Sequence, residues 1–104
     1  MAIFRKKLTS VDILKNLELP NDTRREALPP FQGAREIVIP IMFVEAEMTK
    51  VDVHCSCRSG RLEFRKGWIE IASRMNLNAG DVVTLHWEAQ GGYKMKVRRS
   101  ASRA

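Results

Sequence analysis

The chain has 104 residues, of which 44% are apolar and 29% are charged, and its 18 Lys and Arg outweigh 12 Asp and Glu to give a formal net charge of +6. This length and composition are typical of one folded domain that can bury roughly two-thirds of its unfolded surface without disulfides or metals. No apolar run approaches the ~20 residues of a membrane helix, and no apolar secretory segment follows Met1, so we expect neither a membrane span nor a secretory signal.

The N-terminal part of the chain predicts short strands separated by a helical turn. Residues 3–8 form a strand that becomes basic at its end. Residues 9–15 form a helical turn, because Thr9 or Ser10 can accept the first free amide hydrogens of a helix and Asp12 lies near its positive end. Residues 17–20 alternate and stop at a proline, which indicates a short strand. The polar residues 21–28 form a short helix or a loop.

The middle of the chain predicts three strands. Residues 35–44 give the strongest strand signal, because they are apolar and rich in β-branched side chains. Pro40 removes one backbone donor from this strand, which indicates an edge position or a bulge. After a turn, residues 51–57 alternate as a half-buried strand. Residues 58–61 then form a basic turn that leads into another short strand at 62–65.

From Trp68 onward the apolar period changes from two to about 3.6 residues. Trp68, Ile71, Ala72 and Met75 fall on one face, so we expect a helix that ends in the turn formers of residues 76–80. Residues 82–87 and 93–97 are strands joined by a hairpin turn at Gly91 and Gly92. The basic residues 99–104 are predicted to form a flexible tail.

Together these elements predict one mainly β domain over residues 1–98. About seven short strands with one firm helix, and no strand–helix alternation, favour a closed or partly closed barrel. Trp87 is expected in the core rather than as a base-stacking side chain. One shared core is predicted to contain Trp68, Ile71, Ala72, Leu77, Val83, Leu85, Ile37 and Ile39.

The sequence contains little that could support catalysis or metal binding. Cys55 and Cys57 lie on one face of a strand, roughly 6.5 Å apart, which is poor geometry for a disulfide. A structural zinc site needs about four ligands, and His54 and His86 are the only histidines. We therefore expect two reduced thiols, no metal and no cofactor. No serine has a nucleophile motif and the carboxylates are scattered, so we expect no enzyme.

Three groups of basic residues are the strongest indication of a binding partner. Arg5, Lys6, Lys7 and Lys15 bracket the first loop; Lys50, Arg58, Arg61, Arg65 and Lys66 surround the middle hairpin; and Lys94, Lys96, Arg98, Arg99 and Arg103 close the chain. Each charge taken singly is explained by solvation alone. If the three groups share one concave surface, they can neutralise the phosphates of a nucleic acid.

Two stretches go beyond composition. The first is Phe4-Arg5-Lys6-Lys7-Leu8-Thr9-Ser10-Val11-Asp12 followed by Leu17-Glu18-Leu19-Pro20, and the second joins Gly67-Trp68-Ile69-Glu70 to Asn76-Leu77-Asn78-Ala79-Gly80-Asp81-Val82-Val83. In order and spacing they resemble the plant B-three DNA-binding domain of the auxin-response, abscisic-acid-insensitive and reproductive-meristem transcription factors. The resemblance extends from about Ile3 to Val97. It departs from the family at Glu45, Met48 and Val51, where the family often has Asp, Gly and Trp.

The resemblance implies a seven-stranded open β-barrel with one or two short helices, which grips the major groove of DNA with two arms. Carried onto this sequence, the first arm is residues 6–16 and the second arm is residues 57–66. The implied function is sequence-specific binding of double-stranded DNA by a transcription regulator in a plant nucleus, with other transcription regulators as further partners and no membrane. The candidate base readers are Lys7, Ser10, Lys15, Asn16, Arg58, Ser59 and Arg61, and the candidate phosphate contacts are Arg5, Lys6, Lys50, Arg65 and Lys66.

Two alternatives remain open at the level of sequence. The same barrel could act as a protein-interaction module with weak DNA binding, if the strand that ends in Met42-Phe43-Val44 exposes an edge for pairing. A similar barrel also reads the target site in restriction enzymes. This chain has no room for a nuclease domain, so it would then be a fragment of such an enzyme.

Overall fold

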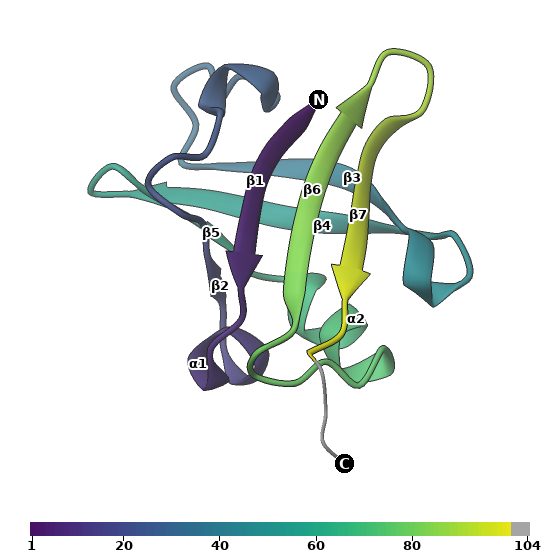
Figure 1. Ribbon diagram of the computed structural model, residues 1–104. Coiled ribbons are helices and arrows are strands. Elements are labelled where there is room, and N and C mark those ends of the chain that lie inside the picture. Colours follow the sequence, from purple (N-terminus) through teal and green to yellow (C-terminus); the bar gives the residue numbers. More distant parts are fainter. Residues whose placement is uncertain (101–104) are drawn as a thin grey trace.

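Seven strands form one curled sheet, in the order β1-β6-β7-β3-β4-β5-β2, in the computed structural model, which describes residues 1–100 (Figure 1). The strands are β1 (Ala2–Lys7), β2 (Leu17–Glu18), β3 (Glu36–Phe43), β4 (Thr49–Arg58), β5 (Arg61–Phe64), β6 (Val82–Glu88) and β7 (Gly92–Arg98). Neighbours are antiparallel except β3 and β7, which are parallel. The strands at the two ends of this order, β1 and β2, do not pair with each other, so the barrel is open. The predicted seven-stranded open β-barrel is therefore confirmed.

Two short helices and two 3-10 turns connect the strands. They are α1 (Ser10–Leu14), α2 (Trp68–Arg74), η1 (Arg25–Ala27) and η2 (Val44–Ala46). Gly67 precedes α2 with a φ of 94°, and a Cβ built there would lie 2.4 Å from the Asp52 carbonyl oxygen, so only glycine fits. No helix within residues 1–100 is long and apolar enough to cross a membrane.

The core lies between the front strands β1, β6 and β7 and the strands β3 and β4 behind them (Figure 1). Trp68, Ile71, Ala72, Leu77, Val83, Leu85 and Ile39 are buried there as predicted, and Ile37 packs against them half-buried. Phe4 on β1 meets Phe64 on β5 edge to face, with ring centroids 5.9 Å apart. These strands are far apart in the sheet order, so the two rings can meet only because the sheet curls strongly.

Trp87 does not belong to this core, which corrects the sequence prediction. The residue is 39% exposed, whereas Val83 and Leu85, on the same face of β6, are fully buried. Trp87 pairs with Tyr93 next to the turn between β6 and β7, where the strand has passed beyond the core. Alternation along a strand predicts which face a side chain occupies, but not how far the core extends along that strand.

At Met42 and Phe43, β3 does not have the free edge that the sequence suggested. β3 pairs with β4 over its whole length and with β7 at Ile41, Met42 and Phe43. The β7 pairing begins one residue after Pro40, so at the proline β3 has only β4 beside it. This explains how proline is tolerated in an interior strand. Met42 and Phe43, two of the three residues proposed for edge pairing with another protein, therefore have strand partners on both sides, and Val44 lies in η2.

The start of the predicted tail is bound to the domain. The Ser100 amide donates to Asp81 Oδ1 (2.8 Å), and the Arg99 guanidinium donates to the Met75 carbonyl (2.7 Å) and to Asp81 Oδ2 (3.3 Å). Asp81 also accepts the Asn78 amide hydrogen (2.9 Å) and is 2% exposed. Residues 99 and 100 thus extend the packed part beyond residue 98. The rest of the predicted tail, residues 101–104 with Arg103, lies outside the described residues.

Candidate nucleic-acid interface

The first arm is tied to the core by one buried hydrogen bond and several partly buried ones. Trp68 Nε1 donates to the Asp12 carbonyl oxygen (2.7 Å), which joins α1 to α2. Asp12 closes a capping box, because its Oδ2 accepts from the Thr9 amide (2.8 Å) and its own amide donates to Thr9 Oγ1 (3.3 Å). The Leu8 amide donates to the Asp81 carbonyl oxygen (2.8 Å) where β1 enters the arm.

Lys6 takes part in these supports and also lines the hollow of the first arm. Its ammonium bonds to Asp12 Oδ1 at 3.1 Å and to the Glu18 carbonyl oxygen at 2.5 Å, and the side chain is 20% exposed. Two of the three ammonium donors are thus used inside the protein, which leaves one for a ligand. These two bonds link β1, α1 and the start of β2, and the phosphate contact expected of Lys6 stays a prediction.

The exposed part of the first arm is the outer side of α1 and the residues after it. Ser10 and Lys15 are exposed and Asn16 is half-buried. Lys15 and Asn16 line one hollow with Val11, Glu18 and Glu63. Val11 and Leu14 are apolar yet 57% and 74% exposed, so α1 presents a surface that the core does not use.

The second arm is the β4–β5 hairpin with a two-residue turn. Ser59 and Gly60 have φ values of 52° and 78°, the left-handed pair that a tight hairpin needs. Arg58 and Arg61 pair directly across this turn, and the guanidinium of Arg25 donates to the Gly60 carbonyl oxygen. The tip is therefore held from outside by η1, a contact that the polar stretch 21–28 did not reveal.

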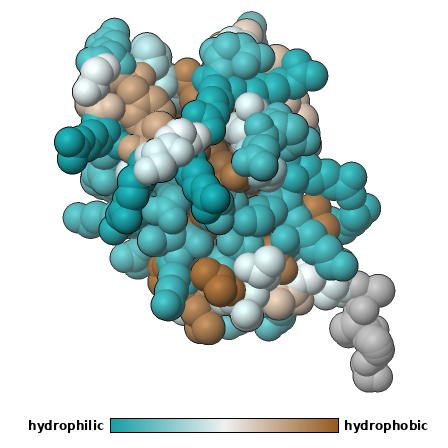
Figure 2. Space-filling view, turned by 90° about the vertical axis from the view of Figure 1, so that its left-hand side faces the viewer, coloured by the Kyte–Doolittle hydropathy of each residue, from teal (hydrophilic) through white to brown (hydrophobic). Residues whose placement is uncertain are grey.

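Pairing between β2 and β5 brings the two arms side by side. Leu17 is opposite Phe64 and Glu18 is opposite Glu63. The strand that follows the first arm, β2, therefore lies beside β5, which is part of the second arm. Glu63 lines the hollow of the first arm and also a second hollow with Arg58, Ser59 and Arg61. This side of the molecule faces the viewer in Figure 2, where hydrophilic side chains cover most of the surface.

Carboxylates engage some of the cations on this side. Arg61 lies 3.6 Å from Glu18 and Arg65 lies 3.5 Å from Glu63, and ion pairs that water reaches in this way contribute at most about 1 kcal/mol. Within residues 1–100, Lys15 and Arg58 form no ion pair. Among the predicted base readers at the two tips, Lys15 and Arg58 are therefore the cations whose charge is most available to a polyanion.

Other candidates lie away from the tips. Lys50 is on the same strand as Arg58 but eight residues earlier, which corresponds to about 27 Å. Arg5 and Lys7 project from the outward face of β1, and Lys7 lines a different hollow together with Arg98. Lys66 is exposed beside β4, where its carbonyl oxygen accepts from the His54 amide. The twelve predicted residues therefore do not form one continuous site.

Arg35 is a basic residue near the second arm that the sequence did not single out. It lines a hollow with Arg58 and Arg65 on the side of the hairpin that β3 borders. Its position follows from the β3–β4 pairing, in which the Cys57 amide donates to the Arg35 carbonyl oxygen (2.9 Å). In the sequence it was only the first residue of a strand, since nothing there shows which strands are neighbours.

Both cysteines are free. Burial, with a smaller contribution from Cys57, raises the pKa of the Cys55 thiol to about 12, so this thiol stays protonated at neutral pH. Cys57 is half-buried on the same face of β4. Across residues 1–100, no three His, Cys, Asp or Glu side chains come together in a way that could hold a metal ion.

Comparison with known proteins finds similarity in solved structures. Neither a protein-family model nor a curated protein sequence matches the chain. The structure of an Arabidopsis FUS3–DNA complex is similar with a TM-score of 0.75 and 16% identity, over 97% of this chain and 100% of that one. The structure of the hypothetical Arabidopsis thaliana protein At1g16640.1 is similar with a TM-score of 0.71 and 17% identity, over 96% of this chain and 92% of that one.

At such low identities the likeness establishes the fold. The chain has the seven-stranded open-barrel fold of the plant B-three domain, so the resemblance read from its two sequence stretches is confirmed at the level of fold. The FUS3 structure, by its description, holds DNA, and that statement concerns FUS3.

Proposed function

We propose that this chain is a B-three DNA-binding domain, spanning residues 1–98 with Arg99 and Ser100 attached, that binds double-stranded DNA sequence-specifically. It acts without catalysis, as part of a transcription regulator in a plant nucleus. The observation that carries the proposal is the β2–β5 pairing, which sets two arms with exposed cations next to each other. The similarity of the whole chain to a protein solved in complex with DNA supports it.

In this proposal the second arm enters the major groove. A two-stranded β-ribbon fits that groove, and the guanidinium of an arginine can pair with the O6 and N7 atoms of guanine. Arg58 is exposed beside the turn and has no carboxylate partner among the described residues. Ser10, Lys15 and Asn16 approach the same groove from the first arm, where a lysine can pair with guanine and an asparagine with adenine.

The test begins by selecting a preferred duplex from a random pool and measuring its Kd beside that of a scrambled duplex. Arg58→Ala is expected to weaken binding to the preferred duplex by about 1–3 kcal/mol and binding to the scrambled duplex far less. Arg74→Ala, an exposed arginine at the end of α2, is the matched control and is expected to leave specificity unchanged. Equal losses on both duplexes would leave Arg58 as a mere phosphate contact, and selection that enriches no sequence would contradict specific recognition.

One observation favours the second candidate, a protein-interaction module. Val11 and Leu14 form an exposed apolar pair on α1, which a partner protein could cover. The same binding experiment separates the two candidates. If the protein fails to bind any duplex even at low salt, the DNA-binding proposal is lost and this apolar pair becomes the surface to examine.

A further inference from the structure

The outward positions of β1, β6 and β7 carry a concentration of positive charge that lies apart from the two tips. These strands lie side by side at the front of the molecule in Figure 1, with the core behind them. Their paired outward residues form rows across the sheet: Lys7, Val82 and Arg98 in one row, Arg5, Thr84 and Lys96 in the next, and His86 and Lys94 in a third. We call Arg5, Lys7, Lys94, Lys96 and Arg98 the outer basic face.

This face has almost no negative charge to balance it. Lys94 pairs with Glu88 at 2.9 Å, at the end of the face next to the β6–β7 turn. Its other four cations take part in none of the ion pairs among residues 1–100. The pKa of His86 is lowered, first by burial and then by the charges of Lys96 and the amino terminus, which agrees with an unneutralised positive field.

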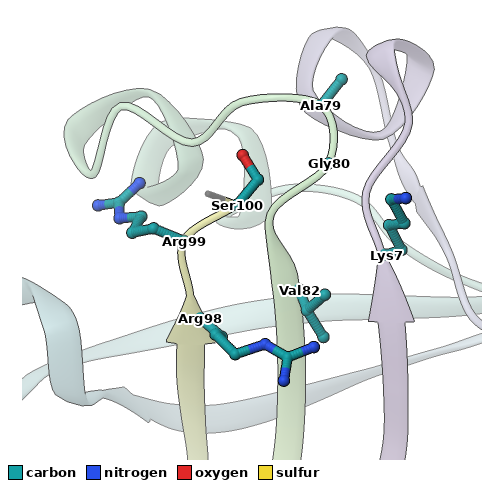
Figure 3. A pocket seen from close by; sticks show the side chains of 7 residues that line it. All are labelled: Lys7, Ala79, Gly80, Val82, Arg98, Arg99 and Ser100. Atoms are coloured by element: carbon teal, nitrogen blue, oxygen red, sulfur yellow. The ribbon is translucent and has the colours of Figure 1, made fainter. Parts of the chain in front are cut away.

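The end of the face nearest the first arm is hollowed. Figure 3 shows Lys7 on β1 and Arg98 on β7 on either side of Val82, with the Arg98 guanidinium reaching across β6. Arg99 also lines this hollow, but its guanidinium is turned toward the end of α2, where it donates to the Met75 carbonyl oxygen. The hollow between the flexible side chains of Lys7 and Arg98 is large enough for a phosphate group.

The arrangement fits a phosphate backbone better than a lipid surface. Cations two residues apart on a strand are about 6.8 Å apart, and one strand of B-DNA carries a charge every 3.4 Å along the axis. Arg5 and Lys7 repeat this spacing on β1, as Lys96 and Arg98 do on β7. Membrane-bound surfaces add large apolar anchors to their basic residues, whereas the central positions here are the half-buried Val82, Thr84 and His86.

We propose that the outer basic face binds the phosphate backbone of DNA flanking the site that the two arms grip, and that it adds affinity without sequence preference. The proposal rests on the proposed function for the position of that DNA. Lys7 connects the two surfaces, because it is the last residue of β1 on the outer face and also belongs to the first arm, residues 6–16. Arg5, Lys96 and Arg98 then serve DNA binding as point charges, not as base readers.

The experiment compares a duplex that contains only the selected site with one extended by about one helical turn, 10 base pairs, at each end. The wild-type protein is expected to bind the longer duplex more tightly and with a steeper dependence of log K on log salt. Arg5→Gln, Lys96→Gln and Arg98→Gln are each expected to lower that slope by about 0.9 on the longer duplex and to leave the short duplex unaffected. Arg74→Gln, which removes an equal charge outside the face, is expected to change neither slope. As a second reporter, the His86 ring resonance is expected to shift only with the longer duplex.

The outcomes separate this proposal from the one on which it rests. Unchanged slopes in all three variants overturn the proposal for the outer basic face. The proposed function survives that result if Arg58→Ala still abolishes specificity. Equal losses on short and long duplexes also overturn it, because the face would then touch the gripped site itself. If no sequence is preferred but the three variants still lower the slope on a long scrambled duplex, backbone binding by the face stands and the proposed function fails. Tighter binding to phosphatidylserine vesicles than to the long duplex, lost in the variants, would assign the face to membranes instead.

Discussion

The two arms are built in different ways. The first arm is held by buried groups, since Trp68 donates to the Asp12 carbonyl oxygen, Asp12 caps α1 and binds Lys6, and the Asp81 loop braces Leu8. Beyond its strand pairing, the second arm is held at its tip by an exposed contact from Arg25 and a long ion pair between Arg61 and Glu18. Changes that loosen the first arm should therefore cost global stability, and changes at the second tip should alter binding alone.

Removing the anchor of the first arm is expected to have the largest effect. Trp68→Ala should lower the free energy of unfolding by about 3–5 kcal/mol, because it empties a fully buried ring site and leaves the Asp12 carbonyl oxygen without its donor. Trp87→Ala is the matched control and should cost less than about 1 kcal/mol, since this ring is partly exposed. Urea titration of both variants measures the difference, and equal losses would contradict the different burial of the two rings.

The Asp81 carboxylate stabilises the loop that braces the first arm, and this stabilisation depends on pH. Burial alone would raise the pKa of Asp81, but the amide hydrogens of Ser100 and Asn78 and the Arg99 guanidinium outweigh it and hold the pKa below its usual value. A lowered pKa in the folded state stabilises the protein above the unfolded pKa of about 3.9, and this contribution disappears as pH falls through the folded value. Asp81→Asn should therefore cost about 1–3 kcal/mol at pH 7 and progressively less toward pH 2. Thermal unfolding from pH 7 to pH 2 checks this, and a constant difference would show that the carboxylate charge is not involved.

The capping box of α1 should contribute a smaller amount. Thr9→Ala removes the oxygen that accepts the Asp12 amide hydrogen and is expected to lower the free energy of unfolding by about 1 kcal/mol. Thr9→Ser keeps that oxygen and serves as the control. Hydrogen exchange should quicken at the α1 amides in the alanine variant alone, and equal exchange in both variants would show that the cap does not hold the arm.

The second tip should give the smallest effect on stability. Arg25→Ala removes an exposed contact to Gly60 and is expected to change the free energy of unfolding by less than about 0.5 kcal/mol. Faster amide exchange near Ser59 and Gly60 is nevertheless expected, because η1 no longer steadies the turn. A loss above 1 kcal/mol would mean that the second arm is as firmly tied to the core as the first.

Local patterns in the sequence determined much of this protein. Thr9 and Asp12 predicted the start of α1, the period change at Trp68 predicted α2, and alternation predicted the strands, because each depends on hydrogen bonds and apolar spacing within a few residues. The two family-like stretches predicted the open barrel and the position of the arms along the chain. The sequence could not show that Arg58 has no carboxylate partner while Lys6 bonds to Asp12 and Glu18, since folding alone brings these partners to Lys6.

Only the tertiary structure decided which of these elements meet. The β2–β5 pairing that unites the arms, the exposed position of Trp87 and the two neighbours of Met42 all depend on strand order and on the curl of the sheet. The outer basic face is of the same kind, because Arg5 and Lys96 are 91 residues apart in the sequence and become neighbours across Thr84. Local propensity and spacing act over a few residues, whereas long-range strand pairing is selected by packing of the whole core, and a single sequence does not reveal that choice.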